Sequence, residues 1–322
     1  MTISGKHLAI LAGIYAILAP IPLWLGEYFI HVLNISFYYV VMAASWNLIA
    51  GYTGQFSLAH HAFAAMGGYM SALLVIHINI PILLGIPLGG LLAGAVGFFL
   101  GTLCLRMRAL YLGLATWAFA ESFRITLSMG YKLTRGDLGL STPTLLDTGQ
   151  AFHYYYIFLL LAIISLYIMY RIICSRIGYY IRSIRDDEEA ALSMGVNTVK
   201  WKRFVFVISS FFAGIAGAFY GHYIGLLSPV SVDFNEMAIL IIMVITGGLR
   251  TFAGPIIGAV FIELLSEVLR EYGEIRMVLF ALMVIILMRV NRDGIVGLGR
   301  NVLPKIKAAL MRNVEMVSGR VK

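Results

Sequence analysis

Four of the 16 acidic residues of the chain stand together at positions 186–189, between basic residues, in the middle of a very apolar sequence. Carboxylates at the front of a short helix suit the positive end of the helix dipole. The composition of 187–194 favours such a helix, and Gly195 is a typical residue for its end. Charges clustered in this way can bind a soluble partner. The alternative is a solvated helix that merely connects its neighbours.

Glu121 and Arg124 lie one helical turn apart within a long apolar run. An unpaired charge in such a run would be costly, so a local ion pair is the first interpretation and direct contact with a solute the second. Glu263 and Glu267 form a similar row with Arg270. Proton coupling through these carboxylates would be the chemistry of an ion-driven secondary transporter.

Two adjacent histidines, His60 and His61, follow a glycine-rich stretch. Neighbouring side chains point in different directions on a helix, so joint metal binding is not expected and no metal site is predicted. We interpret His60 as a residue that orders the preceding turn, with Gln55 and Ser57 capping or lining it. Where the end of a broken helix faces a pathway, its backbone groups can also meet a polar solute.

The sequence contains no recognisable motif for hydrolytic chemistry. Its only Gly-Lys pair, at Gly5 and Lys6, lacks the preceding glycines of a Walker A loop. There is no HExxH motif, and no Ser-His-Asp arrangement follows from the spacing. We therefore predict that the chain is not an enzyme and holds no cofactor, so that any ATP chemistry belongs to another chain.

The composition excludes an ordinary soluble protein. The chain is 60% hydrophobic and only 12% charged, with a mean hydropathy of +0.88, whereas a soluble domain is normally about a quarter charged. The prediction is an all-α polytopic membrane protein that contacts lipid. Its net charge of +8 is better explained by Lys and Arg in cytoplasmic loops than by nucleic-acid binding.

Apolar runs long enough for spanning helices fill most of the chain. Residues 1–322 are therefore expected to form one transmembrane domain of about ten helices. The expected segments are 7–29, 30–50, 55–76, 80–104, 108–129, 153–174, 203–226, 236–249, 255–272 and 274–290. Glycine-rich joins predict broken helices and close packing, and the residues singled out are Gly51, Gly54, Gly217, Gly221, Gly247, Gly248 and Gly254.

The distribution of positive charge predicts the orientation. With the N-terminus in the cytoplasm and one crossing per segment, most of the 24 Lys and Arg residues fall on the cytoplasmic side. This favours an N-in/C-in arrangement, which places the loop 180–200 in the cytoplasm. The basic segment 291–322 is then a cytoplasmic tail, and part of it is expected to lie on the inner leaflet as an amphipathic helix or to remain a solvated tail.

The string Glu189-Ala-Ala-Leu-Ser-Met-Gly195 resembles the EAA loop of ABC-importer permeases. In that family the loop forms a short coupling helix that docks into a cleft on the ATPase subunit. The small side chains would allow close seating, and the glycine would let the chain turn back to the membrane. The resemblance implies that coupling to the ATPase involves Arg185, Asp186, Asp187, Glu188, Glu189, Ala190, Ala191 and Gly195.

Further motifs extend this resemblance along the chain, from about residue 40 to 297. They are similar to those of branched-chain amino acid ABC-transporter permeases, in the LivM-like branch. The matching strings are Gly51-Tyr-Thr-Gly-Gln-Phe-Ser-Leu-Ala-His60, Thr116-Trp-Ala-Phe-Ala-Glu121, Arg182-Ser-Ile-Arg-Asp-Asp-Glu188, Ala213-Gly-Ile-Ala-Gly-Ala218 and Met243-Val-Ile-Thr-Gly-Gly-Leu249 with Gly254-Pro-Ile-Ile-Gly258.

The resemblance implies a permease in the bacterial inner membrane. Its expected partners are a homologous permease, two cytoplasmic ATPases that carry ATP-Mg, and an extracytoplasmic solute-binding protein. The candidates for the solute path are Gln55, Ser57, His60, Trp117 and Glu121. The sequence departs from the family pattern at Ala59, His61 and Arg135, so urea, short amides or another amino acid remain alternatives to a branched-chain substrate.

Overall fold

The computed structural model describes residues 13, 15, 18–104, 107, 109–146, 151–273, 275–291 and 293–298. Within these residues, five helices are long and apolar enough to cross a membrane. They are α2 (Glu27–Asn47, continued by a π turn at Leu48–Tyr52), α3 (His60–Ile78), α4 (Ile82–Cys104), α7 (Ala151–Ile173) and α10 (Thr198–Ile224). The helical, membrane-spanning class predicted from composition is confirmed.

Four further helices belong to the described part of the bundle. They are α5 (Ala109–Met129), α11 (Phe234–Gly247), α12 (Ala253–Val268) and α13 (Ile275–Val290). Each segment expected from residue 30 onward thus corresponds to one described helix, with bounds that agree within a few residues. The first expected segment, 7–29, does not run as one helix to residue 29, because a turn at residues 19 and 20 and the 3-10 turn at Ile21–Leu23 interrupt it and Glu27 already begins α2. The basic tail, 291–322, lies mostly outside the described residues.

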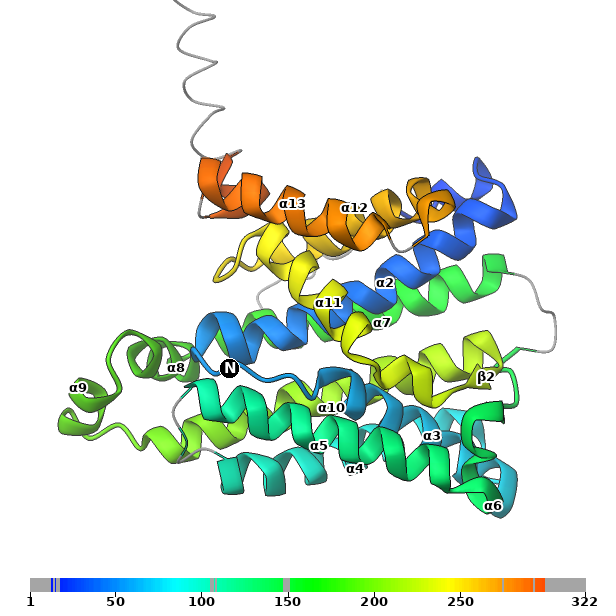
Figure 1. The fold of residues 1–322 in the computed structure, drawn as a ribbon, viewed down its shortest axis with the longest axis horizontal. Coiled ribbons are helices and arrows are strands. Elements are labelled where there is room, and N and C mark those ends of the chain that lie inside the picture. Colours follow the sequence, from blue (N-terminus) through cyan, green and yellow to red (C-terminus); the bar gives the residue numbers. More distant parts are fainter. Residues whose placement is uncertain are drawn as a thin grey trace, which may run out of the picture.

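The tightest part of the bundle is formed by α3, α4 and α10, which have the most extensive mutual contacts (Figure 1). A Cβ atom at Gly67 would overlap the backbone of Gly214, and one at Gly217 would overlap the carbonyl of Ala64. Small residues allow such close approach in lipid, where packing holds helices together. Gly225, four residues after Gly221, has a different role, because it ends α10 with a φ of 78°.

A second group of helices surrounds α2, which contacts α7, α10, α11 and α12. This central position agrees with the burial of its C-terminal half, where Val41, Trp46 and Ile49 are almost completely enclosed. Figure 1 shows α12 and α13 on one side of α2 and α3, α4 and α5 on the other, with α11 running across α2 between the two groups. The helix α2 therefore lies between the two halves of the molecule.

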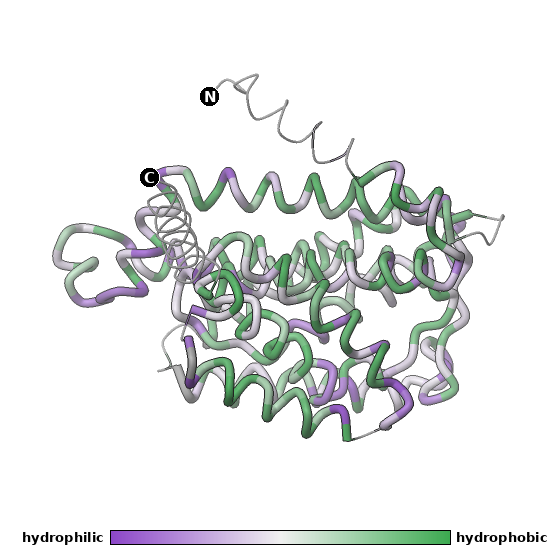
Figure 2. Tube along the Cα trace, turned by 90° about the horizontal axis from the view of Figure 1, so that it is seen from above, coloured by the Kyte–Doolittle hydropathy of each residue, from purple (hydrophilic) through white to green (hydrophobic). Residues whose placement is uncertain are grey.

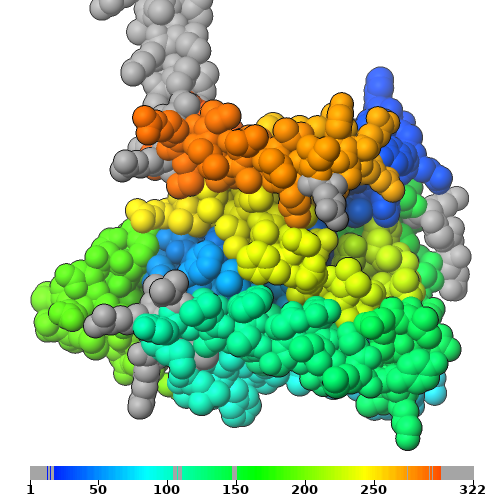
Figure 3. Space-filling model, in the orientation of Figure 1, coloured from blue at the N-terminus to red at the C-terminus, as the bar shows by residue number. Residues whose placement is uncertain are grey.

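The two ends of the bundle differ in character. At one end lie α6 (Tyr131–Thr134), short 3-10 turns at Gly136–Leu138 and Pro229–Val232, and an antiparallel pair of strands, β1 (Leu140–Ser141) and β2 (Leu226–Leu227). At the other end, α8 (Arg176–Asp186) and α9 (Glu188–Ser193) project as a hydrophilic lobe (Figures 2 and 3). Two more 3-10 turns lie at Ile21–Leu23 and Arg270–Tyr272.

The strand pair was not expected for an all-α chain. It forms where two glycines with positive φ, Gly139 (81°) and Gly225 (78°), redirect the chain. The pairing aligns Leu140 with Leu227, and the Thr142 amide continues it by donating to the Gly225 carbonyl over 2.9 Å. These bonds attach the loop after α5 to the end of α10.

Candidate functional site

The projecting helix α9 begins where the acidic cluster predicted. Asp187 is its N-cap, with extended backbone angles of φ −158° and ψ 109°, and its Oδ1 accepts a hydrogen bond from the Ala190 amide over 3.0 Å. Glu188 and Glu189 occupy the first turn, where their negative charges stabilise the helix by interacting with the positive end of its dipole. The acidic residues therefore set the start of α9 as well as its surface charge.

The end of α9 also follows the prediction. Gly195 has a φ of 82°, in the left-handed region that glycine adopts without strain. Its amide donates to the Leu192 carbonyl over 2.9 Å, and the Val196 amide donates to the Ala191 carbonyl over 3.0 Å. A Cβ atom at position 195 would meet no other atom within 4 Å, so the surface beside this turn is open.

The exposed face of α9 combines charge with apolar side chains. Ala190 and the acidic residues 186–189 are exposed, whereas Ala191 is buried within the chain. Leu192 is 52% exposed and Met194 is 84% exposed. The sequence analysis missed these two, although apolar residues in a charged loop are a detectable signal. Together they form a surface suited to contact with another protein.

Two contacts hold the lobe against the start of α10, one from α9 and one from α8. The Lys202 ammonium pairs with the Glu188 carboxylate at 2.6 Å, and the rings of Tyr180 and Trp201 stack with centroids 5.2 Å apart. In addition, Ile181 on α8 is completely buried. The lobe is therefore fixed to the spanning helix that follows it.

Arg185 connects this lobe to the first break in the bundle. Its Nη1 donates to the Gly51 carbonyl over 3.2 Å, and its Nη2 pairs with the Asp186 carboxylate at 2.6 Å. Gly54 lies against the same side chain, because a Cβ there would stand 3.2 Å from the Arg185 Cγ. A displacement of α8 and α9 would therefore act directly on the segment between α2 and α3.

That segment is closed by buried hydrogen bonds. The Gln55 amide donates to the Ile49 carbonyl over 3.1 Å, and the Trp46 indole donates to the Ser57 carbonyl over 2.8 Å. His60 is completely buried, and its Nε2 lies 2.9 Å from the Ser45 Oγ. Gln55, Ser57 and His60 thus lie together, as the sequence predicted, and they order this break.

The second glycine-rich join, between α11 and α12, meets the first through Asn47. The Asn47 side chain donates to the Thr251 carbonyl over 3.0 Å and accepts from the Arg250 amide over 3.3 Å. The backbones around Gly248 and Gly254 approach so closely that a Cβ at position 254 would overlap the Gly248 carbonyl. The two breaks are therefore in direct contact.

The other two path candidates lie elsewhere. Trp117 is 43% exposed on α5, with its ring 6.4 Å from that of Phe234 at the start of α11. Glu121 forms an ion pair with Arg124 at 2.5 Å, which confirms the first interpretation of these two residues. Both candidates therefore lie on α5 and not in the break after α2, and Trp117 meets the first residue of α11.

Several membrane carboxylates have partners. Glu267 accepts a hydrogen bond from the Tyr28 hydroxyl and pairs with Arg270 at 3.3 Å. Glu236 accepts from the Tyr39 hydroxyl over 3.0 Å. Across the part of the chain that the structure describes, no group of three or more His, Cys, Asp or Glu side chains could hold a metal ion.

Comparisons with known proteins agree with this architecture. The family model "Branched-chain amino acid transport system / permease component" matches residues 28–288. The chain is 28% identical to the high-affinity branched-chain amino acid transport system permease protein LivM of Salmonella typhimurium, over 94% of this chain and 77% of the relative. It is 27% identical to LivM of Escherichia coli over the same shares.

The high-affinity branched-chain amino acid transport system permease protein LivH of Escherichia coli is 26% identical over 80% of this chain and 91% of its own length. No solved structure gives a significant match. The relatives are transport permeases and not enzymes, and the apolar helices make this a multi-pass membrane protein. The chain therefore belongs to the family of branched-chain amino acid transport system permease components.

Proposed function

We propose that the chain is the permease subunit of an ATP-driven ABC importer for branched-chain amino acids in the bacterial inner membrane. It works with a second, homologous permease, two cytoplasmic ATPases that bind ATP-Mg, and an extracytoplasmic solute-binding protein. The names of the relatives support the substrate class. The chain itself contributes the membrane path and the contact with the ATPases, and holds no cofactor.

The observation that carries this proposal is the connection from the projecting lobe to the breaks in the bundle. The lobe displays a capped helix with charged and apolar side chains on its free surface. Behind that surface, Arg185 bonds to Gly51, and Asn47 joins the two glycine-rich breaks. An ATPase that moves α9 would therefore move the segments on which access to the membrane interior depends.

The full topology is part of the proposal. Residues 1–322 form one permease domain of about ten spans, N-in and C-in, with the coupling loop 180–200 and the basic tail 291–322 in the cytoplasm. The excess of Lys and Arg on the side of the lobe supports this orientation. The strand pair and α6 then lie on the outer side, where the solute-binding protein delivers its cargo.

We place the solute path on the face where α5 meets α11. Trp117 and Phe234 offer apolar contact there, which suits a branched aliphatic side chain. The paired charges of Glu121 and Arg124 lie one turn further along α5. Gln55, Ser57 and His60 act on this path indirectly, by fixing the break that precedes α3.

Transport by the purified complex tests the energy source. The complex is reconstituted into vesicles with enclosed ATP, so that the ATP supply does not depend on an ion gradient. We expect uptake of radiolabelled leucine that continues after a protonophore and a sodium ionophore, and stops when a non-hydrolysable ATP analogue replaces ATP. Uptake that the ionophores abolish while ATP hydrolysis continues would instead indicate the ion-coupled alternative.

A further inference from the structure

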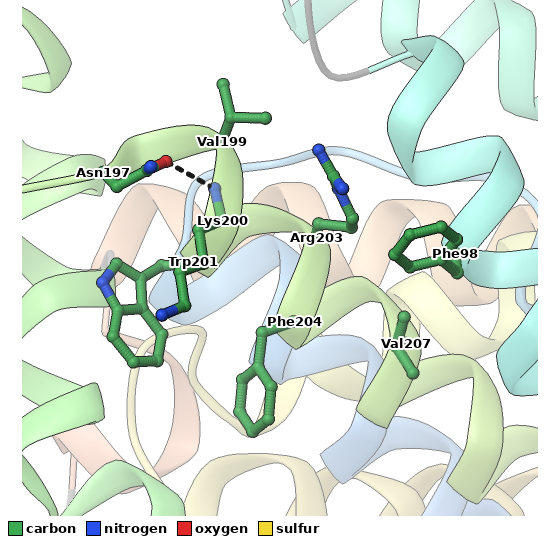
Figure 4. Close-up of a pocket in the computed structure, with 8 residues that line it drawn as sticks. All are labelled: Phe98, Asn197, Val199, Lys200, Trp201, Arg203, Phe204 and Val207. Atoms are coloured by element: carbon green, nitrogen blue, oxygen red, sulfur yellow. Dashed lines mark hydrogen bonds between the residues drawn. The ribbon is translucent and has the colours of Figure 1, made fainter.

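A groove of about 720 Å³ lies on the surface between the end of α4 and the start of α10. Its walls are apolar, with Phe98 on α4 and Phe204 and Val207 on α10, and its basic side chains are Lys200 and Arg203 (Figure 4). Phe98 is 42% exposed. The groove thus combines an apolar wall with two positive charges, Lys200 toward Trp201 and Arg203 toward Phe98.

The two basic groups have no carboxylate partner among the described residues. Lys202, on the same helix, is neutralised by Glu188, but neither Lys200 nor Arg203 takes part in an ion pair in the described ranges. The Nε of Arg203 is buried and has no hydrogen-bond partner there. A buried, unpaired guanidinium nitrogen is costly, so this position favours an anionic group that accepts a hydrogen bond.

Aromatic rings hold both cations in place. The Arg203 guanidinium carbon lies 5.1 Å from the centre of the Phe98 ring, and the Lys200 ammonium lies 5.3 Å from the centre of the Trp201 ring. Figure 4 shows the Arg203 side chain extended beside Phe98. Trp and basic residues at the end of a spanning helix are typical of the level of lipid headgroups.

We propose that this groove binds an anionic phospholipid of the cytoplasmic leaflet. The phosphate accepts hydrogen bonds from Arg203, and Lys200 adds a second positive charge on the other side of the groove. One acyl chain runs along Phe98, Phe204 and Val207. A free phosphate would satisfy the charges but leave the apolar wall unused, and a neutral lipid would leave the charges unpaired.

The site lies beside the coupling lobe. Lys202, which pairs with Glu188 of α9, and Trp201, which stacks on Tyr180 of α8, belong to the same turn of α10 as the groove. A bound lipid would therefore order the turn on which the lobe rests. The assignment to the cytoplasmic leaflet rests on the proposed orientation, whereas the binding test depends neither on that orientation nor on transport.

Native mass spectrometry of the purified protein in mild detergent tests the assignment. We expect phosphatidylglycerol added at equal concentration to be retained more strongly than phosphatidylcholine. Removal of one cation should weaken phosphatidylglycerol binding about five-fold, given about 1 kcal/mol for each basic residue near an anionic membrane. The variants are Arg203→Gln and Lys200→Gln; Lys200 is exposed, so the second change leaves the fold intact.

Arg176→Gln is the matched control, because it removes one positive charge from an exposed side chain near the same end of the molecule but outside the groove. Equal loss of phosphatidylglycerol from this control and from Arg203→Gln would overturn the proposal. Equal retention of phosphatidylcholine would also overturn it. Displacement of phosphatidylglycerol by millimolar inorganic phosphate would show that the groove recognises phosphate alone, and this too would contradict a lipid site.

Discussion

At the scale of single residues, Asp187 decides where α9 begins. Its side chain accepts from the Ala190 amide, which would otherwise face water without a partner at the exposed tip of the lobe. The sequence predicts that the acidic cluster binds another protein. Asp187 also caps α9, so its effect on the stability of this helix must be measured separately from any contact with an ATPase.

Substitution of this cap should loosen α9 without affecting the spanning helices. Asp187→Ala is expected to lower the stability of α9 by about 1 kcal/mol, because the side-chain acceptor is lost. Amide hydrogen exchange across 188–193 should then become about five-fold faster. Asp187→Asn keeps an oxygen acceptor and serves as the control. Unchanged exchange in Asp187→Ala would mean that the cap does not hold the helix.

Gly195 permits a second test at the same scale. Its φ of 82° costs an alanine about 1 kcal/mol, whereas asparagine tolerates this region better. Because the space beside it is open, Gly195→Arg should fold but obstruct a docked ATPase. We expect ATP-driven uptake to be lost in Gly195→Arg and partly retained in Gly195→Asn. Normal uptake by a fully assembled Gly195→Arg complex would argue against docking at this turn.

At the scale of elements, the bond between Arg185 and the Gly51 carbonyl joins the lobe to the break after α2. Arg185→Gln should leave ATP hydrolysis nearly intact but reduce leucine uptake about tenfold, since a hydrogen bond from a charged group contributes about 1.5 kcal/mol. Both rates are measured in the same vesicles. Asp186→Asn removes the ion pair and keeps the bond to Gly51, so it should reduce uptake clearly less than Arg185→Gln does.

Two outcomes would contradict this account of coupling. If Asp186→Asn impaired uptake as much as Arg185→Gln, the charge of the pair and not the link to Gly51 would matter. A parallel fall in hydrolysis and uptake in Arg185→Gln would indicate lost assembly. Size-exclusion chromatography of the complex distinguishes lost assembly from lost coupling.

The packing of α3 against α10 gives a matched pair of variants. An added Cβ at Gly217 would overlap the backbone of Ala64, which cannot move independently of its helix. At Gly221 the nearest atoms belong to the flexible side chain of Leu227, at 2.9 Å. Gly217→Ala should therefore lower the free energy of unfolding by about 2 kcal/mol, which is measured as a lower melting temperature in detergent. Gly221→Ala should change the melting temperature little.

A small effect at Gly217 together with a large one at Gly221 would show that α3 and α10 are not packed as described. Equal, small effects would mean that the helices separate easily enough to accept a methyl group. Neither result is compatible with the close contact between these two backbones.

At the scale of the whole molecule, the sequence predicts the helices well because long apolar runs and glycine-rich joins are local features. The segment 30–50 corresponds to α2, and the predicted helix 187–194 corresponds to α9. The strand pair at Leu140 and Leu227 was missed. Two-residue strands have no periodicity of their own, and they exist only because distant turns bring them together.

The sequence predicted only those parts of the site whose residues lie close together along the chain. Gln55, Ser57 and His60 are close in sequence, and the structure keeps them together. Trp117 and Glu121 come from another helix, and no local pattern could show that Trp117 meets the start of α11 and not the first break. The contact between Arg185 and Gly51 spans more than a hundred residues, so it could be found only in the folded chain.

The central claim is that the exposed surface of α9 binds the ATPases. The most direct measurement is affinity purification of the chain from native membranes in mild detergent, with mass spectrometry of the chains that accompany it. We compare the native chain with a variant that carries Glu189→Lys and Met194→Asp, both on the free surface of α9. A second permease and P-loop ATPases should accompany the native chain, and the variant should retain the permease but lose the ATPases. A native chain that purifies without ATPases, yet transports leucine when reconstituted alone, would contradict this account.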